Sequence, residues 1–181
     1  GITSKYSLLN VQTADGTKSL DIGVKQIHQG SWNSIGGLQD TYSRDIYHSV
    51  ADSGTFRDPY TGEIIPFRAE WTDVSTQGPL NSMTVDPTAQ LWDPALQEWK
   101  QVGDSTSLSK VTFRPMYSNW HNGIPMDVSD MMYSQYFFFE WGTDSGESDQ
   151  TKDPEYTAQA SVAIPLMKGM IFTPTEIQAY I

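Results

Sequence analysis

Residues 111–141, VTFRPMYSNWHNGIPMDVSDMMYSQYFFFEW, form the most informative stretch of this 181-residue chain. The first residues are typical of a strand, Asn122-Gly123 predicts a tight turn, and a helix is predicted over 127–141. Asp127 can accept hydrogen bonds from first-turn amides, and Asp130 follows three residues later, as in a capping box. Both acids also lie at the positive end of the helix dipole. The stretch therefore predicts a strand, a turn and a capped helix in that order.

Apolar side chains set the expected burial of two helices. Along the helix at 127–141 they recur at steps of three and four residues, which indicates that most of this helix is buried. They are Met131, Tyr133, Phe137, Phe138 and Trp141. A second helix is predicted over 38–50, because an apolar residue recurs there every fourth position. These residues are Leu38, Tyr42, Ile46 and Val50.

The 111–141 stretch resembles the signature of the family 5 extracytoplasmic solute-binding proteins, the oligopeptide-binding type of ABC importers. The matching segments, in order and spacing, are 111–114, 120–123, 125–130 and 133–134. Asn122 replaces the usual Asp, Asp127 the usual Thr, and Met131 the usual Val. Asn still suits a turn and Asp still suits a helix cap, so the structural logic of the motif is preserved.

A second block lies upstream and resembles the same family. Residues 38–50 are similar to the first helix of the family, and 58–66 followed by Ala69-Glu70-Trp71 are similar to its hairpin. Phe67-Arg68 stands where Leu is usual. The two blocks together cover about half of the chain.

The resemblance implies a fold class and a domain organisation. We expect an α/β or α+β chain with a mixed β-sheet and packed helices, forming part of one lobe of a two-lobed, class II periplasmic-binding-protein-like fold. Residues 1–181 would be a single partial domain, an N-terminal lobe fragment. Residues 72–110 exceed the usual link and predict an inserted β-hairpin, with strand pieces at 81–85, 90–92 and 98–102. Residues 174–181 are interpreted as the start of a helix.

The loop before the first helix is the best ligand-binding candidate, because in the family it lies in the interlobe cleft and touches ligand. Trp32 offers a stacking platform, Asn33 and Ser34 offer hydrogen-bonding groups, and Ile35 and Gly36 complete the loop. The alternative is an ordinary glycine-rich helix start with a packed Trp. Tyr156 is a second candidate, because the family carries a ligand-contacting Tyr in a comparable place.

Charge and composition exclude several kinds of partner. A formal net charge of −11 argues against a nucleic-acid backbone or an anionic membrane surface. No apolar stretch approaches the ~18 residues of a membrane span, and no cysteine is present. Residues 142–155 are typical of a solvated loop, and their acids match no calcium-loop pattern. Residues 1–30 predict a hairpin. No catalytic residue, metal site or cofactor is predicted, and the chain is not expected to be an enzyme.

The expected function is therefore that of the substrate-binding component of an ABC importer, which would bind a peptide or a sugar between two lobes and deliver it to a membrane permease. The protein would be extracytoplasmic, at the cell surface or in the periplasm, and anchored to the membrane through segments absent here. An alternative is a non-transporting cell-surface structural or interaction protein that keeps the lobe as a scaffold. A third hypothesis, glycan hydrolysis by Glu70 and Glu140, has the weakest support.

Overall fold

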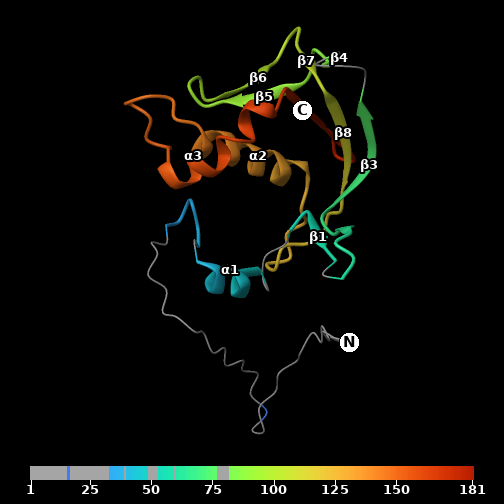
Figure 1. Ribbon diagram of the computed structural model, residues 1–181, viewed down its shortest axis with the longest axis vertical. Helices are drawn as coiled ribbons and strands as arrows, with labels where there is room; N and C mark the ends of the chain where they lie inside the picture. Colours follow the sequence, from blue (N-terminus) through green and yellow to red (C-terminus); the bar gives the residue numbers. More distant parts are fainter. Residues whose placement is uncertain (1–15, 17–32, 39, 49–52, 59, 77–81) are drawn as a thin grey trace.

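The computed structural model describes residues 16, 33–38, 40–48, 53–58, 60–76 and 82–181 (Figure 1). The helices of this described part are α1 (Thr41–His48), α2 (Val128–Gly142), α3 (Pro154–Ala160) and the 3₁₀ turn η1 (Ile164–Leu166). Its strands are β1 (Thr55–Arg57), β2 (Ile64–Pro66), β3 (Ala69–Thr76), β4 (Met83–Thr84), β5 (Gln90–Asp93), β6 (Glu98–Gln101), β7 (Thr106–Ser107), β8 (Ser109–Pro115), β9 (Gly169–Phe172) and β10 (Ile177–Tyr180).

A six-stranded sheet in the order β3-β8-β10-β9-β5-β6 organises the described part of the chain. Strands β1 and β2 form a separate hairpin, and β4 pairs with β7. Helices α2 and α3 lie against one another beside the sheet (Figure 1). The expected α/β or α+β class is confirmed. A mixed sheet was expected, whereas every pairing among the described strands is antiparallel, and this selects α+β.

The stretch that predicted strand, turn and capped helix folds as expected. Strand β8 is followed by a turn in which Gly123 has φ +84, a conformation that suits glycine. The Asp127 side chain accepts a hydrogen bond from the amide of Ser129 at 2.7 Å. The Asp130 side chain accepts one from the amide of Asp127 at 2.9 Å, which completes the capping box.

The burial of α2 differs from the prediction. Its fully buried residues are Phe139, Glu140 and Gly142, whereas Tyr133 is exposed and the other predicted core residues are half-buried. Only the C-terminal part of the helix is enclosed on several sides, because α3, η1 and β5 lie against it there. The N-terminal part borders a cavity instead.

Residues 90–101 form a hairpin of β5 and β6, inside the stretch where the sequence predicted one. Trp92 and Trp99 are cross-strand partners with ring centroids 5.8 Å apart, and such aromatic pairs stabilise antiparallel strands. The hairpin extends the main sheet, because Gln90 of β5 pairs with Met170 of β9. That it is an insertion relative to the family stays a prediction.

Residues 174–181 correct a prediction: they form strand β10 and not the start of a helix. This strand lies between β8 and β9 and pairs with both. Ile177, Ala179 and Tyr180 are buried. Pairing on both edges satisfies the backbone of β10 and buries its apolar side chains, which outweighs any local helix preference.

Two buried clusters lie on the sheet. One contains Met83, Val85, Ala89 and Tyr180, and the other contains Met170, Ile177 and Ala179. Helix α1 occupies residues 41–48 of the predicted 38–50, and the Asp40 side chain accepts a hydrogen bond from the amide of Ser43 at 2.9 Å. Residues 49–50 and the hairpin predicted within 1–30, Gly16 excepted, lie outside the described residues.

Candidate functional site

The predicted ligand loop is a closed turn from Asn33 to Gly37. The amide of Gly37 donates to the carbonyl of Asn33 at 3.0 Å, and Gly37 has φ +75. The Asn33 side-chain oxygen accepts from the amides of Ile35, at 2.9 Å, and of Gly36. A Cβ at Gly36 would lie 3.1 Å from the side-chain nitrogen Nδ2 of Asn33, so the turn is packed tightly around the Asn33 side chain. Ser34 is exposed at its tip.

A hydrogen bond joins this loop to helix α3. Asn33 Nδ2 donates to Glu155 Oε2 at 3.2 Å, across 122 positions of sequence. A Cβ at Gly36 would also come within 3.4 Å of Asp153 Oδ1. The loop and the region around Tyr156, predicted as separate ligand contacts, are therefore neighbours in the fold. Trp32 lies outside the described residues.

Tyr156 is held by its own helix and by α2. Its amide donates to the Asp153 side chain at 2.8 Å, and its ring meets Phe137 edge-on, with centroids 5.6 Å apart. Burial of the ring raises the pKa of Tyr156, so the phenol stays protonated at neutral pH. None of the described residues hydrogen-bonds to the Tyr156 hydroxyl, which leaves a donor and acceptor for a ligand.

A cavity of about 690 Å³ lies between α1, the residues that flank the β1–β2 hairpin, the 118–126 turn and the first half of α2; we call it the α1–α2 cavity. Three aromatic residues border it: Tyr47, Trp120 and Tyr133, whose exposed fractions are 55%, 43% and 64%. Ser118, Asn119, His121 and Ser134 add polar groups. A cavity of this size with apolar walls and a few polar groups is typical of small-molecule sites.

Trp120 and His121 belong to the 120–123 segment of the family signature, where a role in holding the turn is expected. The structure shows that backbone role for Trp120, whose amide donates to the carbonyl of Ile124 and whose carbonyl accepts from Gly123, each at 2.8 Å. The same two residues also border the α1–α2 cavity, which the sequence did not reveal. Arg68 lies there too, with its guanidinium 2.8 Å from Ser118 Oγ and over the ring of Phe67.

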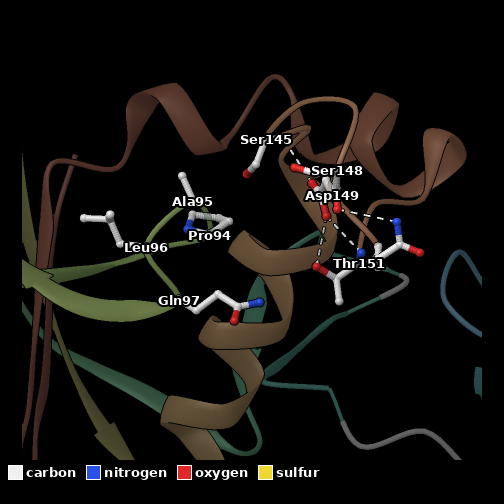
Figure 2. Close-up of a pocket in the computed structure, with 9 residues that line it drawn as sticks. Pro94, Ala95, Leu96, Gln97, Ser145, Ser148, Asp149 and Thr151 are labelled. Atoms are coloured by element: carbon white, nitrogen blue, oxygen red, sulfur yellow. Dashed lines mark hydrogen bonds between the residues drawn. The ribbon is translucent and has the colours of Figure 1, made fainter.

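A smaller polar cleft, of about 330 Å³, separates the β5–β6 turn from the loop after α2 (Figure 2). Pro94 to Gln97 line one side, and Ser145 and 148–151 line the other. Asp149 organises that loop by accepting from the amides of Ser145 and Thr151, each at 2.9 Å. These backbone hydrogen bonds hold the pKa of Asp149 below its ordinary value.

Glu140 lies beneath these two segments and is only 1% exposed. Trp92 Nε1 donates to one carboxylate oxygen at 2.5 Å, and Thr151 Oγ1 donates to the other at 2.6 Å. Glu70, its partner in the hydrolase hypothesis, instead forms a salt bridge with Arg114 across β3 and β8. The two carboxylates thus have separate structural partners, which gives the hydrolase hypothesis no support.

Within the described residues, no group of three or more His, Cys, Asp or Glu side chains could hold a metal ion. The described helices also include none that is long and apolar enough to cross a membrane. A scan against protein-family models and a search of curated proteins found no match. The described part is an α+β chain with three features of interest: a tight polar loop joined to α3, a Tyr156 ring packed against α2, and an aromatic-lined cavity between α1 and α2.

Proposed function

We propose that this chain is part of the N-terminal lobe of an extracytoplasmic solute-binding protein, which delivers a peptide or a sugar to the membrane permease of an ABC importer. The observation that carries the proposal is the hydrogen bond from Asn33 to Glu155. It joins two segments that the family resemblance selects independently as ligand contacts, although they lie more than 100 residues apart. The folding of the signature stretch as strand, turn and capped helix adds support.

The chain offers the kinds of groups that such a receptor needs. Exposed aromatic rings around the α1–α2 cavity can pack on apolar or sugar faces, and Asn119 and Ser118 can form hydrogen bonds there. The Tyr156 hydroxyl, which does not line this cavity and has no hydrogen-bond partner among the described residues, can also form one. In the proposed mechanism, a second lobe closes over the ligand by hinge motion, and no bond is made or broken. The site would lie outside the cytoplasm, and the protein would reach the membrane through a separate anchor.

Titration of the purified chain tests this proposal. Isothermal titration calorimetry is carried out with tripeptide and pentapeptide mixtures and with a panel of disaccharides. It should detect binding of either the peptides or the disaccharides, but not of both. Tyr156→Phe keeps the ring and removes the hydroxyl, and should weaken binding about tenfold, as expected for one lost hydrogen bond. Tyr60→Phe, on the exposed β1–β2 turn, is the matched control and should bind like the parent. Undiminished binding by Tyr156→Phe would contradict the assigned contact. Because one lobe supplies only part of the ligand contacts, binding should be weak, and an absence of saturable binding of peptides and of disaccharides at the highest soluble concentrations would contradict the receptor.

One observation favours the alternative, a cell-surface interaction protein. The β1–β2 hairpin exposes several large apolar side chains: Phe56, Tyr60, Ile64, Ile65 and Phe67. Clusters of this kind often mark contacts between proteins. Native mass spectrometry separates the two functions, since a receptor should appear as a monomer with a co-purified ligand, and a surface scaffold as a ligand-free assembly. Phe56→Ser should dissociate such an assembly.

A further inference from the structure

A third hollow, separate from the loop, Tyr156 and the α1–α2 cavity, lies between the β5–β6 hairpin and the end of α2. Its volume is about 520 Å³, and η1 and the residues after it close one side. We call it the lysine groove. Its walls are mainly apolar and come from segments far apart in the sequence. The apolar residues are Leu91, Trp92, Val102, Phe139, Ile164 and Met167.

Two lysines give this groove a charge opposite to that of the chain. Lys100 and Lys168 line it, together with a single acid, Asp93. The Asp93 carboxylate lies 3.8 Å from Lys100 Nζ and also accepts hydrogen bonds from the amides of Ala95 and Leu96, at 3.1 and 3.2 Å. The residues that line the groove therefore include two cations and one carboxylate, in a chain whose formal net charge is −11.

Lys168 is the lysine of the groove whose positive charge is not paired with a described carboxylate. Its ammonium donates to the backbone carbonyl of Pro165 at 2.9 Å, and no described carboxylate lies within salt-bridge distance of it. A carbonyl neutralises no charge, so two of the three ammonium hydrogens are open to an anion. The contact with Pro165 also holds the ammonium near η1, at the border of the apolar walls.

We propose that the lysine groove binds a fatty acid, with its alkyl chain along the apolar walls and its carboxylate at Lys168 and Lys100. Burial of the alkyl chain supplies the non-directional part of the affinity, because each methylene leaves water. The lysines select the head group, since a carboxylate is repelled by the acidic remainder of the surface and attracted here. A cationic amphiphile of the same length is disfavoured by the same charges.

The test is titration of the purified chain with sodium dodecanoate below its micelle concentration, followed by calorimetry. Dodecan-1-ol and dodecyltrimethylammonium keep the alkyl chain and change only the head group. We expect one dodecanoate per chain, about tenfold weaker binding of the alcohol, and no saturable binding of the ammonium compound. Equal binding of all three would show that only apolar surface is recognised and would overturn the proposal, as would an absence of dodecanoate binding.

Lysine variants locate the head group. Lys168→Met keeps most of the stem and removes the charge, and should weaken dodecanoate binding about tenfold while leaving dodecan-1-ol unchanged. Lys152→Met is the control, because Lys152 lies in the loop after α2 and pairs with Asp144 at 3.0 Å. Urea unfolding of both variants checks that they are folded. Equal losses for the two variants would indicate long-range charge alone and overturn the assignment. Tighter binding of trileucine than of dodecanoate would overturn the fatty-acid proposal and would indicate that the groove binds the carboxyl terminus of a peptide.

Discussion

Trp92 and Glu140 join the edge hairpin of the sheet to the end of helix α2 through a hydrogen bond of 2.5 Å. Because Thr151 donates to the other oxygen of the same carboxylate, three segments meet at one buried side chain. Glu140 pairs with no described lysine or arginine. Removal of either the buried carboxylate or its hydrogen-bond donors would leave a buried polar group without a partner, which costs folding free energy.

Replacement of Glu140 should therefore lower the free energy of unfolding. Glu140→Ala leaves the indole and the Thr151 hydroxyl without their acceptor, at a cost of about 2–3 kcal/mol. Glu140→Gln keeps one acceptor oxygen but turns an NH₂ toward the other donor, and should cost about 1–2 kcal/mol. Urea unfolding followed by tryptophan fluorescence measures both.

The exposed acid Glu147 provides the matched control for Glu140, and Glu147→Ala should change stability by less than about 0.5 kcal/mol. If Glu140→Ala were as mild as this control, the carboxylate would not be joining the three segments as the structure shows.

Gly142 should not tolerate alanine. A Cβ there would lie 2.7 Å from the Cβ of Ala160 and 2.9 Å from Cδ1 of Ile164, so α3 and η1 would have to move away from α2. We expect Gly142→Ala to lower the unfolding free energy by about 1–3 kcal/mol, the usual cost of overpacking. Differential scanning calorimetry should show a lower melting temperature. At Gly54 the nearest atom to a Cβ is 3.8 Å away, so Gly54→Ala should leave the melting temperature nearly unchanged.

The capping box of α2 gives a test of the stretch that decides the fold. Asp127→Ala removes the acceptor of the Ser129 amide and should cost about 1 kcal/mol. Asp127→Asn keeps an acceptor oxygen and should recover most of that loss. Since Asp130 accepts from the Asp127 amide, Asp130→Ala should cost less than Asp127→Ala. Equal stability of Asp127→Ala and the parent in guanidinium unfolding would argue against the cap.

Acid should weaken the loop after α2 through Asp149. Backbone amides of Ser145 and Thr151 hold its pKa below the ordinary 3.8, so the ionised form is favoured in the folded state. The resulting stabilisation is present above that ordinary value and is lost as the pH falls through the lower folded-state pKa. The stability difference between the parent and Asp149→Asn should therefore shrink as the pH falls below 3.8. Glu147→Gln, with the same charge change, serves as control. A difference that grows in acid would contradict the assigned hydrogen bonds.

Local signals in the sequence were sufficient for the α2 region. The Asn-Gly turn and the paired acids of the cap each act within a few residues, and the structure contains both. The apolar spacing correctly indicated a helix, but it did not predict which of its residues are buried. The sequence also predicted a hairpin within 72–110, and its strand pieces at 90–92 and 98–102 correspond to β5 and β6. The fold class was predicted from the family resemblance as α/β or α+β, and the antiparallel strand pairings select α+β.

Features that depend on distant partners could not be predicted. Residues 174–181 form a strand because β8 and β9 flank it, and neither neighbour is visible in the local pattern. The burial of Glu140 could not be predicted, because its two hydrogen-bond donors are 48 positions before and 11 positions after it. Likewise, nothing in the sequence indicated that Trp120 and His121 border a cavity whose walls come from four segments.

The position of β10 has a consequence for biosynthesis. In the sheet order, β10 separates β8 from β9, yet it follows both in the chain. While the ribosome is still translating residues 116–176, β8 has one unpaired edge. The six-stranded sheet cannot be completed until residues 177–180 have been synthesised. Long-range pairings of this kind are slow to form, and open strand edges invite association with other chains. During synthesis this protein should therefore pass through a period of vulnerability to aggregation, in which a holding chaperone would be of most use.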